Sequence, residues 1–109
     1  MDNEIEKFNT FILGATRKPG LFLINKIEDI FFICTGYINA LQYSDGFDAV
    51  FKHINIEYRA FMNKRVKVGF DCDWHRLIRL MSSSDKNSLE FFESSYTAFL
   101  KSKKIKIPK

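Results

Sequence analysis

The stretch Arg17-Lys18-Pro19-Gly20-Leu21-Phe22 decides how the first half of this chain folds. Proline lacks an amide hydrogen and glycine favours turns, so Pro19 followed by Gly20 stops a helix. The residues before it carry apolar side chains three or four positions apart, which is the pattern of one helical face. These side chains are Ile5, Phe8, Phe11, Ile12 and Ala15. We therefore predict a first helix that ends before Pro19 and is followed by a turn.

The chain after this turn is predicted to change from extended to helical at Asn25. Leu21–Ile24 is a short apolar run, which we predict to be an extended connector or a short strand. Asn25 is a favourable N-cap, and Glu28 stands three residues later, as in a capping box. Gly36 lies within this helix, where glycine costs about 1 kcal/mol relative to alanine, so we expect close approach of another helix there. The apolar stripe comprises Ile27, Ile30, Phe31, Cys34, Ile38 and Leu41.

Three more helices are predicted beyond Ser44-Asp45-Gly46, which has the composition of a turn. The basic loop from Asn63 to Gly69 alternates polar and apolar residues in part, which permits a small β-excursion. Asp71 or Asp73 is positioned to cap the helix after this loop, and Ser84 to cap the last helix. The inward-facing residues are Phe47, Val50, Phe51, Ile54, Tyr58 and Phe61, then Trp74, Leu77, Ile78 and Met81, and finally Leu89, Phe92, Tyr96 and Phe99.

Length and composition predict one domain with its own core. A chain of 109 residues has the usual size of one domain, and 46% of its residues are hydrophobic. Twelve residues are phenylalanine, and each buried aromatic ring removes about 150–250 Å² from water, so a few can close a small core. We therefore predict an all-α fold, a compact single-domain bundle of about five helices with room for one short extended segment.

The positive charge is concentrated in residues 101–109. The net charge is +4, but this segment holds five lysines and no acid. Residues 1–100 then hold 12 basic and 13 acidic side chains, a net charge of −1. We therefore divide the chain into a helical domain, residues 1–100, and a basic tail, residues 101–109. Such a tail is either a solvated chain end, the commoner case, or a phosphate-binding segment.

The sequence indicates a cytoplasmic protein with no membrane partner. Met1-Asp2-Asn3-Glu4 is acidic where a signal peptide is basic. The longest apolar stretch, Ile30–Cys34, is far shorter than the roughly 20 residues of a membrane span. Cys34 and Cys72 are too few and too widely spaced for a disulfide framework, so we expect reduced thiols.

No group of residues has the spacing of a catalytic or metal site. His53 and His75 are the only histidines, and neither has cysteines or carboxylates at metal-ligand spacing. A ribonuclease that uses both histidines stays open, although nothing in their spacing indicates it. Asp71-Cys72-Asp73 lacks the further oxygen ligands and the glycine of a calcium loop, so helix capping is the favoured interpretation. We expect no cofactor, no metal and no enzymatic activity.

One basic cluster could contact nucleic acid. His75, Arg76 and Arg79 share the polar side of the helix predicted over residues 74–81. A short basic helix after a turn can enter a DNA major groove. A core helix also needs a solvated face, and the long loop before this helix favours that simpler interpretation. Together with the basic tail, the cluster supports an alternative function as a small DNA- or RNA-binding regulator.

Acidic residues occur in pairs that could form a negative surface. A single pair is typical of a helix cap or a solvated face, whereas several pairs on one surface would complement the cationic cleft of a nuclease. The sequence leaves both interpretations open. The pairs are Glu28/Asp29, Asp45/Asp48, Asp71/Asp73 and Glu90/Glu93.

The order of several short motifs resembles the immunity proteins of contact-dependent growth inhibition and related polymorphic toxin systems. In that family a first amphipathic helix precedes Arg-x-Pro-Gly and an aromatic residue. A Gly-Tyr pair within a helix, a Phe-rich helix, a Trp-x-x-Leu-Ile helix and a Phe-Phe pair follow. The match covers about residues 8–100, and Phe22 stands where the family has tyrosine. The matching residues are Arg17–Phe22, Gly36-Tyr37, Phe47, Phe51, Tyr58, Trp74–Ile78 and Phe91-Phe92.

The resemblance implies a non-enzymatic intracellular inhibitor. Such proteins bind one cognate toxin C-terminal domain, often a nuclease, and cover its active site or substrate surface. The shared residues have the character of a scaffold, namely Arg17, Pro19, Gly20, Gly36, Tyr37 and Trp74. For the toxin-binding surface we select acids, with Asp45 and Asp48 first because a turn before a helix leaves them exposed. Asp71 and Asp73 come second because helix capping could occupy them.

Overall fold

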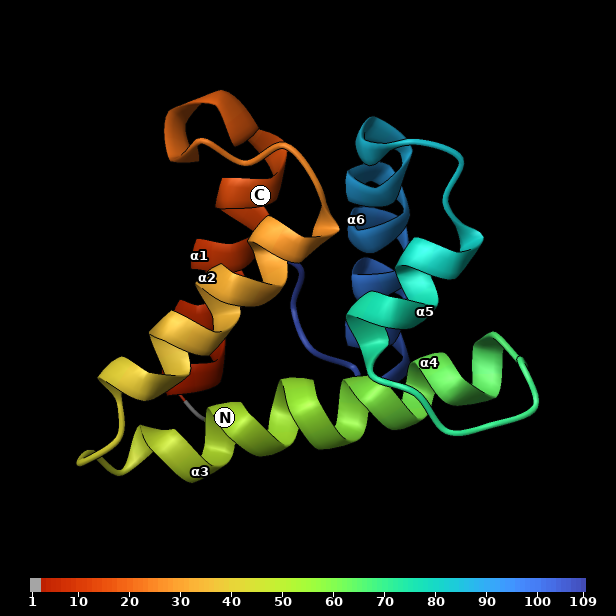
Figure 1. The fold of residues 1–109 in the computed structure, drawn as a ribbon. Coiled ribbons are helices and arrows are strands. Elements are labelled where there is room, and N and C mark those ends of the chain that lie inside the picture. The colour runs from red at the N-terminus through yellow and green to blue at the C-terminus, as the bar shows by residue number, and fades with distance from the viewer. Residues whose placement is uncertain (1–2) are drawn as a thin grey trace.

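Helices make up the regular structure of residues 3–109, which the computed structural model describes, and this range contains no strand. The elements are α1 (Asn3–Arg17), the 3₁₀ turn η1 (Pro19–Phe22), α2 (Ile27–Ala40), α3 (Gly46–Phe51), the π-helical segment η2 (Lys52–Tyr58), α4 (Arg59–Arg65), α5 (Trp74–Met81) and α6 (Asp85–Ser102). α3, η2 and α4 follow one another without a break and form one long rod, the α3–α4 rod (Figure 1). The predicted all-α fold of about five helices is confirmed.

The α3–α4 rod lies across the lower ends of the other helices in Figure 1. α1 and α2 run side by side in opposite directions in one half of the molecule, and α5 and α6 lie in the other half. The rod contacts α1 and α2 through α3 and contacts α5 through α4. Because α6 also contacts α1 and α2, one continuous core lies between the two halves.

Aromatic rings fill the space between the rod, α5 and α6. The ring centroid of Tyr58 lies 5.1 Å from Tyr96, 5.6 Å from Trp74 and 6.0 Å from Phe92. All four side chains are buried. Such ring pairs contribute about 0.5–1.5 kcal/mol each beyond the burial of their area. The predicted inward positions of these residues are confirmed.

The buried stripe of the rod runs through the π-helical segment η2. A π-helix bonds residue i to residue i+5, so its turn is wider than an α-turn. Val50, Ile54 and Tyr58 are buried four residues apart as predicted, and His53 is buried beside them. Phe51, which precedes the segment and was predicted to face inward, is partly exposed instead.

The segment Leu21–Ile24 is neither a strand nor an extended connector. Pro19 begins a tight 3₁₀ turn, and its carbonyl accepts a hydrogen bond from the Ile24 amide at 2.9 Å. Leu23 closes the turn with a left-handed backbone at φ 56°. Of the four apolar side chains only Ile24 is buried, so the prediction of a short strand was wrong. A proline-initiated turn, rather than apolar composition, sets the conformation here.

Tertiary contacts replace the local cap predicted for α2. The N-cap residue is Lys26 rather than Asn25, and the Ile27 amide donates to the Ser88 hydroxyl of α6 at 3.1 Å. The Glu28 side chain does not form the predicted capping box, because it pairs with Arg79. In contrast, Ser84 caps α6 as predicted and accepts the Asn87 amide at 3.0 Å.

The loop between α4 and α5 is held by side chains and contains no strand within residues 66–73. The Asn63 amide group bonds to both the backbone N–H and the carbonyl of Cys72, at 3.0 and 2.8 Å. Val66 and Cys72 are buried at the two ends of the loop. The predicted β-excursion was therefore wrong, because the loop closes through Asn63 rather than through a ladder.

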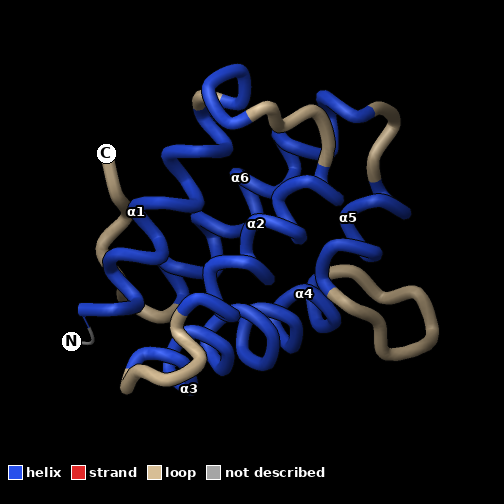
Figure 2. Tube along the Cα trace, turned by 60° about the vertical axis from the view of Figure 1, so that its left-hand side comes forward, coloured by secondary structure: helices blue, strands red, loops and turns tan. Residues whose placement is uncertain are grey.

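The basic tail packs against the body instead of extending into solvent. Ile105 and Ile107 lie against the core, and the Ile105 amide donates to the Leu100 carbonyl at 2.9 Å. Arg17 of α1 donates from Nη1 to the Pro108 carbonyl at 2.8 Å. Figure 2 shows this segment returning to α1. Within residues 3–109, no helix combines the length and the apolar character that crossing a bilayer requires.

Trp74→Ala should lower the free energy of unfolding by about 3–5 kcal/mol, because it leaves a large cavity in the aromatic core. The Trp74 side chain is 1% exposed, and its indole N–H donates to Asn55 at 3.2 Å. Leu80→Ala is the matched control on the same helix, since Leu80 is 61% exposed and its loss should cost less than about 0.5 kcal/mol. Urea denaturation measures both, and equal losses would contradict the packing described.

Gly36→Ala should raise the free energy of unfolding by about 1 kcal/mol. The close helix approach expected at Gly36 is wrong: the residue is exposed, and an added Cβ would meet no described atom within 4 Å apart from its chain neighbours and its own helix backbone. Gly46→Ala is the control, because its Cβ would lie 2.5 Å from Cγ of Glu4. Thermal and urea melts should show opposite signs for the two variants. Destabilisation by Gly36→Ala would mean that glycine is needed there for another reason.

Candidate functional site

The two predicted acid pairs do not converge on one surface. Asp45 and Asp48 lie at the start of α3, whereas Asp71 and Asp73 lie beside Arg59 of α4. The rod rises about 1.5 Å per residue, so about 20 Å separates its start from Arg59. The acids therefore form two separate sites, which differ in how far their charges are neutralised.

The turn of residues 43–48, here called the acidic turn, presents unpaired carboxylates on an ordered backbone. Asp45 and Asp48 are exposed, and neither forms an ion pair with a residue of the described chain. The Ser44 amide donates to the Leu41 carbonyl at 2.8 Å, which fixes the entry to the turn. Gly46 is buried against the side chain of Glu4. The predicted exposure of both acids is thereby confirmed.

Tyr43 adds an aromatic ring to the acidic turn. Its side chain is 97% exposed, more than any other large hydrophobic residue in the described chain. Exposed tyrosines next to charged residues are typical of protein-binding hot spots, because the ring supplies contact area with few rotatable bonds. Sequence reasoning missed Tyr43, although its place between a helix end and a turn is the available signal.

Asp71 and Asp73 pair with Arg59 of α4 and, within the described chain, accept no cap hydrogen bond from the N-terminus of α5. Arg59 Nη2 lies 2.9 Å from Asp71, and its Nε lies 3.6 Å from Asp73. Asp73 occupies the N-cap position of α5, but neither carboxylate caps the helix within the described chain. The predicted N-cap position of Asp73 is therefore confirmed, whereas its carboxylate lies near Arg59 and does not bond a helix N–H of the described chain. The pairing reduces the negative charge that this site presents.

The basic residues of α5 are largely committed to contacts within the protein. Arg79 donates two hydrogen bonds to Glu28, at 2.7 and 2.9 Å, and one to Asp85 at 3.0 Å. The hydrogen bonds from Arg79 lower the pKa of the Glu28 carboxyl to about 2. The His75 ring stacks on Phe31 at 3.7 Å, and burial lowers its pKa. Of the predicted cluster, Arg76 alone is exposed and without a partner in residues 3–109.

His53 is a buried member of a polar network. Its Nε2 lies 2.8 Å from the Tyr96 hydroxyl and 3.1 Å from Oδ1 of Asn9, and the Tyr96 hydroxyl also donates to Asn9. Burial lowers the pKa of His53 to about 4, so the ring is neutral at pH 7. The partners of His75 are different, so the two histidines do not share a site. In the described part of the chain, no three His, Cys, Asp or Glu residues form a potential metal site.

The residues of the suspected family motif hold the scaffold together. Arg17 donates to Glu93 of α6 at 2.8 Å and also binds the tail. The Tyr37 ring lies 5.3 Å from Phe8 and 5.3 Å from Phe11, between α1 and α2. Trp74 anchors α5, and Pro19-Gly20 forms the turn after α1. Gly36 is the exception, since nothing in the structure explains a glycine at that position.

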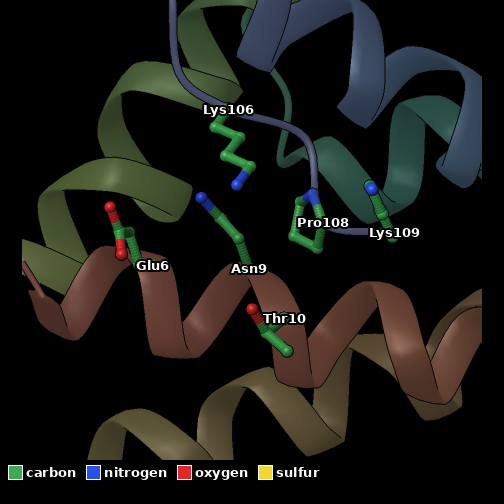
Figure 3. Close-up of a pocket in the computed structure, with 6 residues that line it drawn as sticks. All are labelled: Glu6, Asn9, Thr10, Lys106, Pro108 and Lys109. Atoms are coloured by element: carbon green, nitrogen blue, oxygen red, sulfur yellow. The ribbon is translucent and has the colours of Figure 1, made fainter.

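A pocket that sequence reasoning missed lies between α1 and the tail. It has a volume of about 240 Å³ and is lined by Glu6, Asn9, Thr10, Lys106, Pro108 and Lys109 (Figure 3). The available signal was Asn9, a polar residue between Phe8 and Ile12 on the buried side of α1. The basic tail forms the other wall. A tail interpreted as a solvated segment gave no reason to predict a pocket there.

The stability of the protein should fall as the pH is lowered from about 6.5 to about 4. Unfolded His53 binds a proton near its ordinary pKa of 6.5, whereas the folded side chain does so only near 4. The stabilisation is therefore complete above pH 6.5 and is lost as the pH falls, by up to about 3 kcal/mol. Urea melts across this range should show a flatter profile for His53→Gln than for the parent. Arg76→Gln, which removes one exposed cation, is the control, and an unchanged slope in His53→Gln would contradict this assignment.

Two features thus have the geometry of a binding site: the acidic turn, with its exposed ring and free carboxylates, and the pocket between α1 and the tail. The first suits a large cationic partner and the second a small ligand. Comparison with known proteins identified no similar family model, no similar curated protein and no similar solved structure.

Proposed function

We propose that this chain is a cytoplasmic immunity protein that binds a cognate bacterial toxin domain, a nuclease in the first instance. It would act without catalysis, by covering the active site or substrate surface of the toxin. The acidic turn carries this proposal, because it places Asp45 and Asp48, exposed and unpaired, beside the exposed ring of Tyr43. The motif order that resembles immunity proteins supports the same function.

Charge complementarity is the physical reason for choosing the acidic turn. A nuclease must hold phosphates, so its cleft is cationic and attracts carboxylates that have no cation of their own. Asp45 and Asp48 satisfy this condition, whereas Asp71 and Asp73 share Arg59. The attraction would speed encounter with the toxin, and this gain would weaken with salt.

The order of the turn favours tight binding. Ser44 bonds to Leu41 through both its amide and its hydroxyl, at 2.8 and 2.9 Å, and Phe47 donates to the Ser44 carbonyl at 3.3 Å. A surface that is already ordered loses little conformational freedom on association, so more of the contact energy remains as affinity. Tyr43 would then insert between toxin side chains as the central anchor.

The alternative function, a small DNA- or RNA-binding regulator, is supported by fewer free groups. Lys101, Lys104, Lys106 and Lys109 of the tail are exposed. The other half of that proposed interface was α5, where His75 is stacked on Phe31 and Arg79 is bound to two carboxylates. A helix that enters a groove needs side chains free to reach the bases. The acidic turn therefore offers more unpaired functional side chains than α5 does.

Asp45→Lys combined with Asp48→Lys should weaken toxin binding by about tenfold or more, and Tyr43→Ala by about thirtyfold. The measurement is co-expression with the toxin domain encoded beside this gene, together with calorimetry on the purified pair. Asp48→Lys and Glu90→Lys form a matched comparison, since each reverses one exposed acid and Glu90 lies on α6. Toxin affinity should fall with the first and stay unchanged with the second.

The role of the tail needs substitutions rather than deletion. Removing residues 101–109 would take Ile105 and Ile107 from the core and so lower stability as well as charge. Lys101→Ala with Lys104→Ala lowers the charge while leaving those contacts in place, and protection should survive it. Toxin affinity that is unchanged by reversal at Asp45 and Asp48 would contradict the proposal. A gel shift of DNA or RNA at physiological salt, with no toxin partner, would favour the regulator.

A further inference from the structure

The pocket between α1 and the tail has one wall on each of two distant parts of the chain. Glu6, Asn9 and Thr10 come from neighbouring turns of α1, and Lys106, Pro108 and Lys109 come from the tail (Figure 3). Arg17 fixes the tail wall by its hydrogen bond to the Pro108 carbonyl. Ile105 and Ile107 fix it further by packing on the core. The pocket is therefore a built feature of the fold rather than a gap beside a loose chain end.

Asn9 leaves a hydrogen-bond donor unused at the floor of this pocket. The Asn9 side chain is 1% exposed, and its Nδ2 has no partner among residues 3–109. Its Oδ1 is fully engaged, since it accepts from the Tyr96 hydroxyl and lies 3.1 Å from Nε2 of His53. Figure 3 shows the amide nitrogen pointing into the space below Lys106. Buried amide donors are almost always paired, so an acceptor belongs at this position.

The network behind Asn9 fixes which end of its amide faces the pocket. The Tyr96 hydroxyl donates to Oδ1, so the Tyr96 oxygen is free to accept from His53. A neutral His53 with its proton on Nε2 then donates to both neighbours and completes the set. Neither nearby group offers a lone pair to Nδ2 in this arrangement. The missing acceptor has to come from the pocket side.

We propose that this pocket binds a small molecule through its carboxylate, with Asn9 Nδ2 donating to one oxygen and Lys106 and Lys109 supplying positive charge. Charge-assisted hydrogen bonds of this kind are shorter and stronger than neutral ones. Glu6 on the same wall limits the charge that the pocket accepts, because the lining side chains carry one net positive charge. A monocarboxylate group fits that balance better than a dianionic phosphate.

The size of the pocket agrees with a small organic acid. Its volume of about 240 Å³ is several times the roughly 30 Å³ that one water molecule takes in the liquid. The site uses none of the residues of the acidic turn, so this ligand would bind independently of a toxin domain. The proposal therefore goes beyond the proposed function and does not depend on it.

The test follows the side-chain amide signals of Asn9 by NMR while acetate, propionate or inorganic phosphate is added to the full chain. Acetate and propionate should shift these signals saturably, with dissociation constants of roughly 1–10 mM, and phosphate should bind more weakly. Lys106→Glu should weaken propionate binding by about fivefold or more. Lys101→Glu is the matched control, because it makes the same change of charge on the same segment but does not line the pocket. It should leave the titration unchanged.

Three results would overturn the proposal. The first is the absence of any saturable shift up to roughly 100 mM of either carboxylate, which would leave ordered water as the partner of Asn9. The second is equal weakening by Lys106→Glu and Lys101→Glu, or tighter binding of phosphate than of propionate. The third is a proton on Nδ1 rather than Nε2 of His53, read from its nitrogen chemical shifts. In that tautomer Nδ2 of Asn9 would donate to His53, and the pocket would face an oxygen instead.

Discussion

The buried phenol of Tyr58 is the contact on which the rest of the structure depends. Its ring joins the α3–α4 rod to Trp74 of α5 and to Phe92 and Tyr96 of α6. The Ser95 hydroxyl donates to the Phe92 carbonyl, so Tyr58 donates to Ser95 at 2.7 Å and leaves no polar atom unpaired at the centre. Burial raises the pKa of Tyr58, which keeps this donor protonated. The rod is thereby held in one position, and both the acidic turn and Asn9 are placed relative to it.

The helices could be predicted from the sequence because each buries one apolar stripe with a regular period. Prediction failed where distant residues replaced local signals. Asn25 has the chemistry of a cap, but Ser88 binds the start of α2 instead. Leu21–Ile24 is apolar, but Pro19 draws it into a tight turn. His53 is buried beside the apolar stripe of Val50, Ile54 and Tyr58, and its partners Asn9 and Tyr96 come from distant helices.

The candidate surfaces were predictable only as far as local sequence determines exposure. A turn before a helix exposes its acids, so Asp45 and Asp48 could be chosen without coordinates. Asp71 is neutralised by an ion pair with Arg59, twelve residues earlier, and no helical or strand period links these two positions. The pocket was harder to predict, because the residues of its two walls are about 100 positions apart in the sequence. Only the buried position of Asn9 hinted at it.

The docked tail also bears on the order in which the protein is made. The hydrogen bond between Arg17 and Pro108 joins residues 91 positions apart, so it forms only after residue 108 has left the ribosome. The acidic turn depends on near neighbours such as Leu41 and Ser44, and its backbone can order much earlier. During synthesis the chain would therefore acquire its local surface first. Closure of the α1–tail pocket would follow only after residues 106–109 have been made.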